Sequence, residues 1–500
     1  MKRQATNPVL PGYEYIPDAE PRVFGGRVYL YGSHDRFDGG KFCMNDYVTW
    51  SAPVDDLSDW RYEGVIFRKS DDPSNPDSRN ALWAPDVVQG PDGAYYLYYC
   101  LEGDTRRIGI ARSEAPTGKF AFHGYLADKT GAIVGERPGD TIPFDPAVLV
   151  DDDGRVWLYS GNAPYAPHMD ENRQKASVVM ELEPDMKTIR SEPRRLIPLC
   201  YDSAGTGFEG HEFFEASSIR KIGGRYYFVY SSVQLHELCY AVSDHPDREF
   251  RYAGALVSNG DFHDDGFRVD FNMKPNPALK NYIGNNHGGL CEAGGKYYIF
   301  YHRQTNRHMF SRQVCAEEVA LADGAFRRAG LTSCGPGGGP LAGHGAYEAR
   351  IACHLFSKDG AVFSSGPQIQ NNEHPAFTQD RPDMDAGAGA AAGPGAPVPF
   401  QYIENMRDGA TAGFRYFDFR GASGIVVTVR GECEGIFTVR DGLGESANTV
   451  AEVLLQPCES WHDCSAPLCI PDGVHPLYFT FTGTGAVDFG RFAITNCPAG

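Results

Sequence analysis

The stretch GGRYYFVY, residues 223–230, joins a two-glycine turn to a run of alternating aromatic and aliphatic residues. Glycine pairs suit the tight turn of a β-hairpin, and alternation with a period of two is typical of a β-strand. Four similar stretches occur: GGRVYLYG from Gly25, DGAYYLYY from Asp92, DGRVWLYS from Asp153 and GGKYYIFY from Gly294. The five copies start 67, 61, 70 and 71 residues apart. This spacing leaves room in each unit for a four-stranded antiparallel sheet.

Five similar all-β units in one chain predict a five-bladed β-propeller, in which the blades surround a central axis. The alternative is an ordinary β-sandwich whose turns resemble one another by coincidence. The regular spacing of the copies favours the propeller.

One polar or ionisable residue stands six to eight positions before each copy: Asp18, Asp86, Asp145, Glu215 and His287. The innermost strand of each propeller blade lines the central channel, so equivalent positions in successive blades converge at one end of the axis. Converging carboxylates repel one another and are partly desolvated, which raises the pKa of at least one of them. The sequence therefore predicts an acid–base site at this end of the channel.

Five segments, in their order along the chain, resemble glycoside hydrolase family 43. They are NPVLPGYEYIPDAEPRVFGGRVYLYGSHD, WAPDVVQGPDGAYYLYY, FDPAVLVDDDGRVWLYSG, FFEASSIRKIGGRYYFVYSS and NNHGGLCEAGGKYYIFYHRQTN. The resemblance covers roughly residues 7–332. It implies a five-bladed propeller enzyme that removes arabinose, xylose and related sugars from plant glycans.

The same resemblance implies a role for each matching residue. Asp18 corresponds to the general base, Asp145 to the residue that holds and tunes the acid, and Glu215 to the general acid. His287 matches the axial histidine of the family, which lies beside a bound ion or water at the centre of the channel.

These residue types suit the cleavage of a glycosidic bond. The departing oxygen needs a proton, the anomeric carbon needs a nucleophile, and the transition state carries oxocarbenium charge. In an inverting enzyme the base activates a water opposite the acid, which requires carboxyl groups about 6.5 to 9.5 Å apart. The resemblance implies this inverting arrangement, with Asp18 and Glu215 on different blades.

Four further residues are candidates for binding the sugar. Trp83 and Phe214 flank motif positions and could stack on a sugar face, although packing explains such aromatics about as well. His34, in YGSHD, and Arg312, in FSRQ, match family segments that border the sugar pocket. A surface salt bridge is the alternative for either of these two.

Three other carboxylates are given structural roles. Asp86 faces the channel by its repeat position, and we expect it to accept hydrogen bonds from loop amides. Glu209 and Glu212 lie near Glu215 but lack its offset from the repeat. We therefore expect both to be solvated loop carboxylates.

Composition excludes several classes of partner. The 65 acidic and 46 basic residues give a formal net charge of −19, which repels phosphate backbones and anionic lipids. No stretch approaches the 18 or so apolar residues of a membrane span, and no apolar segment follows the basic residues of the N-terminus. We expect a cytoplasmic protein that binds an oligosaccharide substrate and neither nucleic acid nor membrane.

Thirteen cysteines are scattered without C-x-x-C pairs, which favours reduced thiols over a disulfide framework or a zinc site. We expect no required cofactor. The hypothesis that remains is a calcium ion, either in the propeller channel, held indirectly by His287 through water, or in a C-terminal β-sandwich.

The period stops near residue 332, and the glycine-rich SCGPGGGPLAGHG follows. Seven short strand patterns then follow: YEARIACHL, FQYIENM, GFRYFDF, GIVVTVRG, GIFTVRD, TVAEVLL and PLYFTFTG. They predict a β-sandwich at 345–500 after a propeller at 1–334, with the boundary near 335 and a low-complexity loop at 385–397. The segment from GFRYFDFRG to PLYFTFTGTGAVDFGRFAI resembles a carbohydrate-binding module of family 6. A purely structural role, in which this domain supports the propeller, is the alternative.

Together these features predict an inverting, exo-acting α-L-arabinofuranosidase or β-xylosidase. Three alternatives stay open: another furanosidase such as a galactofuranosidase, a glycoside phosphorylase on the same propeller, and a sugar-binding propeller without catalysis. A phosphorylase would need a basic phosphate pocket, and the motifs contain no cluster of Arg, Lys and His that favours one. A binding protein would not need three carboxylates at matched offsets.

Overall fold

The computed structural model describes residues 4–164, 166, 168, 170, 174–262, 274–363, 373–381 and 398–496. The predicted loop at 385–397 lies outside these residues. The described part is built almost entirely of β-strands, with three short 3-10 helices: η1 (Lys69–Asp71), η3 (Gly335–Gly337) and η4 (Ala349–Ile351). Among the described residues, no helix is long and apolar enough to cross a bilayer.

Five antiparallel sheets occupy the first two thirds of the described chain, and each one contains a copy of the repeat. The first sheet contains β1 (Glu20–Phe24), β2 (Arg27–Tyr31), β3 (Tyr47–Pro53) and β4 (Arg61–Phe67). The second contains β5 (Asp86–Gln89), β6 (Tyr95–Leu101), β7 (Asp104–Ser113) and β8 (Ala121–Tyr125). The third contains β9 (Ala147–Val150), β10 (Val156–Asn162), β11 (Ala176–Leu182) and β12 (Arg194–Arg195).

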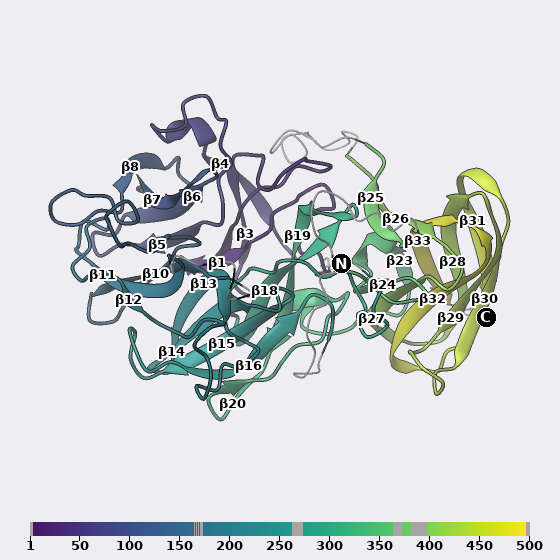
Figure 1. Cartoon of the computed structure of the whole chain (residues 1–500). Helices are drawn as coiled ribbons and strands as arrows, with labels where there is room; N and C mark the ends of the chain where they lie inside the picture. Colours follow the sequence, from purple (N-terminus) through teal and green to yellow (C-terminus); the bar gives the residue numbers. More distant parts are fainter. Residues whose placement is uncertain are drawn as a thin grey trace.

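The fourth sheet contains β13 (Phe213–Ile222), β14 (Arg225–Ser232), β15 (Glu237–Ser243) and β16 (Arg251–Ser258). The fifth contains β17 (Leu290–Ala293), β18 (Lys296–Thr305) and β19 (His308–Val319), and the short hairpin of β20 (Leu321–Ala322) and β21 (Ala325–Phe326) follows it. The first strands of the five sheets touch one another in turn, and β17 returns to contact β1. This closed ring confirms the five-bladed propeller (Figure 1).

The N-terminal segment helps to close the ring. The backbone amide of Val9 donates a hydrogen bond to the carbonyl of Val314 in β19, at 3.1 Å. The side chain of Asn7 pairs with the backbone of Ala316 in the same strand, donating at 3.1 Å and accepting at 2.9 Å. Residues from the start of the chain are thereby fixed to the last propeller sheet, and the two ends of the ring are joined.

The three Gly-Gly copies of the repeat form the predicted tight hairpins. In β13–β14, Ile222 pairs with Arg225, and both glycines between them have positive φ, +57° for Gly223 and +82° for Gly224. Positive φ at both central positions is the requirement of a type I′ turn, which glycine meets without steric cost. The two Asp-Gly copies form longer connections instead, because Gln89 pairs with Tyr95 and Val150 with Val156.

The aromatic residues of each repeat are explained by packing on both faces of the blade. In β14, Phe228 and Tyr230 pack against the third sheet, in a cluster with Trp157. The alternate residue Tyr227 packs against the fifth sheet, in a cluster with Tyr301. Successive side chains of a strand point to opposite faces, so a blade buried between two neighbours needs apolar residues at nearly every position.

Two facing sheets form the second unit, a β-sandwich. One contains β22 (Leu341–Ala342), β24 (His354–Phe356), β27 (Thr411–Phe419), β29 (Cys433–Arg440), β30 (Thr449–Leu455) and β32 (Gly473–Gly485). The other contains β23 (Gly345–Glu348), β25 (Ala376–Gln379), β26 (Gln401–Met406), β28 (Ala422–Gly431), β31 (Cys458–Pro467) and β33 (Val487–Asn496). Phenylalanines at 414, 479, 489 and 492 pack edge-on and tilted between the sheets.

The two units are joined by buried polar contacts. Arg303 of β18 donates to the backbone carbonyls of Arg350, at 2.8 Å, and Ala352, at 3.3 Å. Gln379 of β25 accepts a hydrogen bond from the hydroxyl of Tyr15 at 2.6 Å. In Figure 1 the green and yellow sandwich strands lie to one side of the purple and teal propeller. Because β22 begins at Leu341 and pairs with β27, the sandwich also includes residues ahead of the predicted start at 345.

Candidate active site

Four of the five repeat-linked polar residues meet at one pocket. Asp18 and Asp145 lie two residues before the inner strands β1 and β9, and Glu215 is the third residue of β13. His287 lies three residues before β17. These four side chains line a pocket of about 150 Å³. The convergence predicted from the repeat is therefore present in the structure for these residues.

Backbone conformation directs the three carboxylates. Asp18 and Asp145 have positive φ, +55° and +45°, and Ala216, directly after Glu215, has φ of +68°. Non-glycine residues rarely adopt this left-handed region, and strained backbone of this kind is concentrated at functional sites. In β13 the strain coincides with irregular pairing to β14 on both sides of Glu215. Such a bulge redirects a side chain out of the regular strand pattern, here toward the pocket.

Asp18 is held by a cation and by a neutral imidazole. Arg312 donates from Nη1 to Asp18 Oδ1 at 3.0 Å. The Asp18 amide donates to His302 Nδ1 at 3.3 Å, and His302 Nε2 lies 2.7 Å from the carbonyl oxygen of Asn285, which assigns the imidazole proton to Nε2. Burial raises the pKa of Asp18, but Arg312, the neighbouring His302 and His287 and a hydrogen bond from Ser33 together lower it by more, so the pKa lies below its ordinary value. Asp18 is therefore ionised at neutral pH.

Arg312 is fixed by a second carboxylate, Asp35. The Arg312 guanidinium donates to both Asp35 oxygens, from Nε at 2.8 Å and from Nη2 at 3.0 Å. The Asp35 amide in turn donates to the carbonyl of Tyr15 at 2.9 Å. Bidentate pairing fixes the plane of a guanidinium. One cation thus lies between two buried carboxylates, and Asp35 sets its orientation toward Asp18.

Asp145 and Glu215 form a coupled pair of carboxyl groups. Asp145 Oδ2 accepts from the Ala216 amide at 3.0 Å, and Asn162 donates to Glu215 Oε2 at 3.2 Å. Burial and the charge of Asp18 raise the pKa of Glu215 to about 7. Burial and the charge of Glu215 also raise the pKa of Asp145 well above its ordinary value. Such a pair titrates as a unit and retains at least one proton near neutral pH.

Aromatic rings form the apolar wall of the pocket. Trp83 and Phe144 meet edge to face with their ring centroids 5.2 Å apart. Across the pocket, the Arg312 guanidinium lies 4.7 Å from the centroid of Phe42. The predicted sugar-binding residues Trp83 and Arg312 therefore both line the pocket. Aromatic faces beside hydrogen-bonding groups provide the mixed surface that a sugar ring needs.

His287 lines the same pocket. Its Nδ1 is 3.5 Å from Asp145 Oδ2, and burial lowers its pKa to about 4, so the imidazole is neutral. Gly288 follows it because a Cβ there would lie 1.9 Å from the carbonyl oxygen of Phe300. Calcium prefers six to eight oxygen ligands, whereas His287 offers a ring nitrogen and, among the described residues, the carboxyl group paired with it is that of Asp145. A water-mediated ion at His287 stays a prediction.

Two predicted binding residues lie elsewhere. His34 is buried, its Nδ1 is 2.9 Å from the carbonyl oxygen of Asp46, and it does not line the pocket. Phe214 packs against an apolar cluster that includes Leu235 and Ile283. Both assignments are corrected to structural roles. The sequence indicated the correct loop in YGSHD, but the functional side chain is Asp35, the residue after His34.

The carboxylates predicted to be structural lie outside this pocket. Asp86 accepts from Arg22 at 2.9 and 2.5 Å and from the Val148 amide of β9 at 2.7 Å, so it is a hydrogen-bond acceptor as expected, but its partners are a guanidinium and a strand amide and not loop amides. Glu209 is bonded to the amide of Gly205. Glu212 is buried and accepts from the Ser203 hydroxyl at 2.6 Å, so the expectation that it is solvated was wrong.

The sequence analysis missed several residues of the site: Phe42, Phe144, Asn162 and Asn285. Phe144 directly precedes Asp145, so its place beside a motif residue was a usable signal. Asn162 is the last residue of β10 in the third sheet, and its side chain bonds to Glu215 in the neighbouring fourth sheet. Its role depends on how neighbouring blades pack, which the repeat pattern does not specify.

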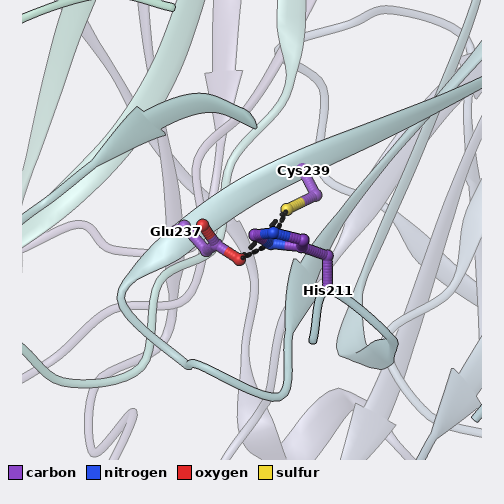
Figure 2. A group of neighbouring side chains, drawn as sticks. All are labelled: His211, Glu237 and Cys239. Atoms are coloured by element: carbon purple, nitrogen blue, oxygen red, sulfur yellow. Dashed lines mark hydrogen bonds and ion pairs between the residues drawn. The ribbon is translucent and has the colours of Figure 1, made fainter. Parts of the chain in front are cut away.

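A separate cluster contains the side chains of His211, Glu237 and Cys239 (Figure 2). Glu237 Oε1 lies 2.7 Å from His211 Nδ1, and it accepts from the Cys239 thiol at 3.3 Å and from the Ser232 hydroxyl at 2.6 Å. Burial raises the pKa of the Cys239 thiol well above its usual value, so the thiol stays protonated. A metal ligand would have to be the thiolate. The contacts therefore favour a hydrogen-bond network that ties the segment before β13 to β15.

Comparison with known proteins identifies the family. The sequence model of glycosyl hydrolases family 43 matches residues 5–326. A xylosidase/arabinosidase from Thermoclostridium stercorarium is 48% identical over 497 residues, which cover 99% of this chain and 99% of that protein. A xylosidase/arabinosidase from Bacteroides ovatus is 31% identical over 322 residues, which cover 59% of this chain and 87% of that protein.

A solved structure matches this chain over both of its parts. It is a glycoside hydrolase family 43 arabinoxylan arabinofuranohydrolase from Bacillus subtilis in complex with cellotetraose. The TM-score is 0.50 at 20% sequence identity, and the match covers 99% of this chain and 98% of the other. At this identity the similarity is one of fold.

Proposed function

This chain belongs to glycosyl hydrolase family 43, and we propose that it removes terminal arabinofuranosyl or xylosyl residues from oligosaccharides with inversion of configuration. Its reaction class is the hydrolysis of O-glycosyl bonds. The choice of pentose is supported by the full-length relative named xylosidase/arabinosidase, with which it shares 48% identity.

One observation carries the proposal: an ionised carboxylate and a protonated carboxyl pair line the same small pocket. The volume of this pocket is about 150 Å³, less than a third of that of the larger cavity beside it. A space of this size suits one sugar ring and not a run of several rings. This supports removal of a single terminal sugar, which is exo action.

We assign the general acid to Glu215. A general acid must carry its proton at the pH of reaction, and a pKa of about 7 meets that condition on the acidic side of neutrality. Its proton passes to the oxygen that joins the terminal sugar to the rest of the substrate. The leaving group then departs as a neutral alcohol, while the O–C bond to the anomeric carbon breaks.

We assign the general base to Asp18. Arg312 keeps its carboxylate ionised, so it can accept a proton from a water on the opposite face of the sugar. The water oxygen forms the new bond to the anomeric carbon, and the configuration there is inverted. The negative charge of Asp18 also favours the oxocarbenium charge that develops in the transition state.

Asp145 acts as a positioning residue in this scheme. It accepts a hydrogen bond from the amide of Ala216, next to Glu215, and so helps to hold the acid's backbone in its left-handed turn. Its coupling to Glu215 also keeps a proton on the pair. Trp83 and Phe144 supply the apolar wall for the sugar ring.

The pocket does not favour a phosphorylase. Among the described residues that line it, Arg312 is the one permanently charged cation. Its Nε and both Nη atoms donate to Asp35 or Asp18, at 2.8 to 3.0 Å. A phosphate would have to displace these carboxylates to reach the guanidinium.

A panel of nitrophenyl glycosides tests the proposed function. We expect turnover of the α-L-arabinofuranoside, the β-D-xyloside or both, without dependence on phosphate. Glucosides and galactopyranosides, which carry an additional hydroxymethyl group, should react far more slowly because the pocket is small. Turnover that requires phosphate, or the absence of turnover on every pentoside, would overturn the proposal.

A further inference from the structure

A second cavity lies beside the proposed acid. Its volume is about 510 Å³, more than three times that of the catalytic pocket. Half of its lining residues are polar or charged, including Asp140, Thr141, Lys175, Arg195, Tyr201 and Asp202, and the rest are apolar residues or glycine. We call it the acid-side cavity. Its size and polarity suit sugar rings with their hydroxyl groups.

Two backbone connections place the acid-side cavity next to Glu215. Pro143 lines the cavity, and the following residue, Phe144, lines the catalytic pocket. Ala176 also lines the cavity and pairs in register with Asn162 across β10 and β11. Asn162 donates its hydrogen bond to Glu215. The wall between the two spaces is therefore formed by the residues that flank the acid.

Lys175 belongs to this wall. Its side chain is partly buried, and its charge is one of those that lower the pKa of Glu215 against the effect of burial. In the described part of the chain, the Lys175 ammonium has no ion pair or hydrogen-bond acceptor. A partly desolvated ammonium has three donors to offer, so it is available for a bound ligand.

The chemistry of glycoside cleavage decides which part of the substrate lies here. The acid must contact the bridging oxygen between the terminal sugar and its leaving group. With the terminal sugar in the catalytic pocket, the leaving group must extend past Glu215. The acid-side cavity lies next to Phe144 and Asn162, on this side of the acid, and its volume of about 510 Å³ has room for more than one ring.

We propose that the acid-side cavity binds the leaving-group sugars of an oligosaccharide, and that Lys175 donates a hydrogen bond to the first of them. This inference rests on the proposed function. Tyr201, over which Arg195 lies at 6.0 Å from the ring centroid, supplies an aromatic surface further along the cavity. The favoured substrate is thus a pentose joined to two or more sugars, not a simple pentoside.

The test compares Lys175→Met with the wild type on two substrate classes: a nitrophenyl pentoside and oligosaccharides with one, two or three leaving-group sugars. We expect wild-type kcat/KM to rise with each added sugar until the cavity is filled. Lys175→Met should lose about tenfold or more on oligosaccharides, mainly through KM, which is the typical effect of deleting a hydrogen bond from a charged donor. On the nitrophenyl pentoside its loss should be much smaller.

Two further variants make the test specific. Thr141→Trp should obstruct the acid-side cavity and cause the same selective loss on oligosaccharides. Lys129→Met is the control and should match the wild type, because Lys129 is exposed, pairs with Glu183 and lines neither the cavity nor the catalytic pocket. Removing the Lys175 charge should also move the basic limb of the pH profile to higher pH, because that charge lowers the pKa of Glu215.

The outcomes separate this inference from the proposed function. If the wild type hydrolyses nitrophenyl pentosides with no gain from added sugars, the cavity does not bind the leaving group and only this inference is overturned. Equal losses by Lys175→Met on both substrate classes would overturn it as well. If no pentoside is hydrolysed at all, the proposed function itself fails.

Discussion

The two sides of the catalytic pocket carry the same kind of side chain in opposite protonation states. Asp18 is buried, but it bonds to Arg312, which a second carboxylate holds in place. Glu215 is less fully buried, its hydrogen-bond partner is the neutral amide of Asn162, and its coupled neighbour is the carboxyl group of Asp145. Burial raises the pKa of both, and the partner decides the result. The difference supports the proposed base and acid without reference to any relative.

The two sides also differ in how the fold supports them. The base side, which contains Asp18, Arg312 and Asp35, is hydrogen-bonded to the sandwich through Tyr15. Gln379 of β25 accepts from the Tyr15 hydroxyl, and the Tyr15 carbonyl accepts from the Asp35 amide. The acid side depends on the irregular start of β13 and the left-handed turn at Ala216. We therefore expect the base side to be sensitive to changes in the sandwich and the acid side to changes between blades.

The largest expected effect comes from Asp18→Asn. Because no group then accepts the proton of the attacking water, kcat should fall by about 10⁴-fold, at the upper end of general acid–base effects. The loss should persist on substrates with good leaving groups, since activation of water is needed for all of them. Added azide, which needs no deprotonation, should restore part of the turnover. Near-native activity of this variant would place the base elsewhere.

Glu215→Gln should have the next largest effect, and one that depends on the substrate. The amide keeps the shape but has no transferable proton, so substrates with poor leaving groups should lose about 10² to 10³-fold in kcat. Activated aryl glycosides need less protonation and should lose far less. Rates across a series of leaving groups measure this directly, and equal losses across the series would contradict the acid assignment.

Gln379→Ala tests whether the hydrogen bond between the sandwich and Tyr15 supports the base side. Removing this acceptor from the Tyr15 hydroxyl should lower kcat by about fivefold, corresponding to about 1 kcal/mol for one hydrogen bond. Gln89→Ala is the matched control, because Gln89 is exposed and its side chain bonds only the Gly93 carbonyl within its own turn. Indistinguishable kinetics for the two variants would show that the sandwich does not support the base side.

The smallest expected effect is a shift in pH dependence with Asn162→Ala. Wild-type activity should fall as pH rises through about 7, because Glu215 then loses its proton. The Asn162 donor lowers the pKa of Glu215, so its removal should raise that pKa and move the basic limb of the kcat profile to higher pH. At pH 5 to 6 the variant should match the wild type. A shift to lower pH would contradict the account of the acid side.

The repeat made most of the propeller predictable from sequence. Hairpins and inward-facing polar positions are local signals that recur with the period, so Asp18, Asp145, Glu215 and His287 could be placed together before the structure was known. Arg312 and Trp83 were also identified, through motif resemblance. His34 and Asp35 show the limit: adjacent residues in one motif point in different directions, and side-chain direction depends on the folded loop.

The sandwich was predicted in outline but not in every element. The pattern YEARIACHL was expected to be one strand, yet β23 ends at Glu348, η4 covers Ala349–Ile351 and β24 begins at His354. Conversely, β31 (Cys458–Pro467) was missed, because its sequence CESWHDCSAP is mostly polar and its residues are largely exposed at the edge of the sheet. Periodicity identifies strands with one buried face, and an exposed edge strand lacks that signal.

The acid-side cavity could not have been found from sequence. Its lining comes from loops and outer strands of the third sheet and from the connection before it, and no repeat position contributes. Recognition of substrate beyond the terminal sugar depends on such irregular segments, which vary more than the blades that carry them.

The measurement that tests the account most directly is the configuration of the sugar first released. Proton NMR in the first minutes of hydrolysis, before mutarotation mixes the anomers, distinguishes the two products. If Asp18 activates water on the face opposite Glu215, the first product must have the anomeric configuration opposite to that of the substrate, and no covalent sugar–enzyme species should accumulate. Release with retained configuration would mean that a carboxylate attacks the anomeric carbon itself. The division of the pocket into a base side and an acid side would then be wrong.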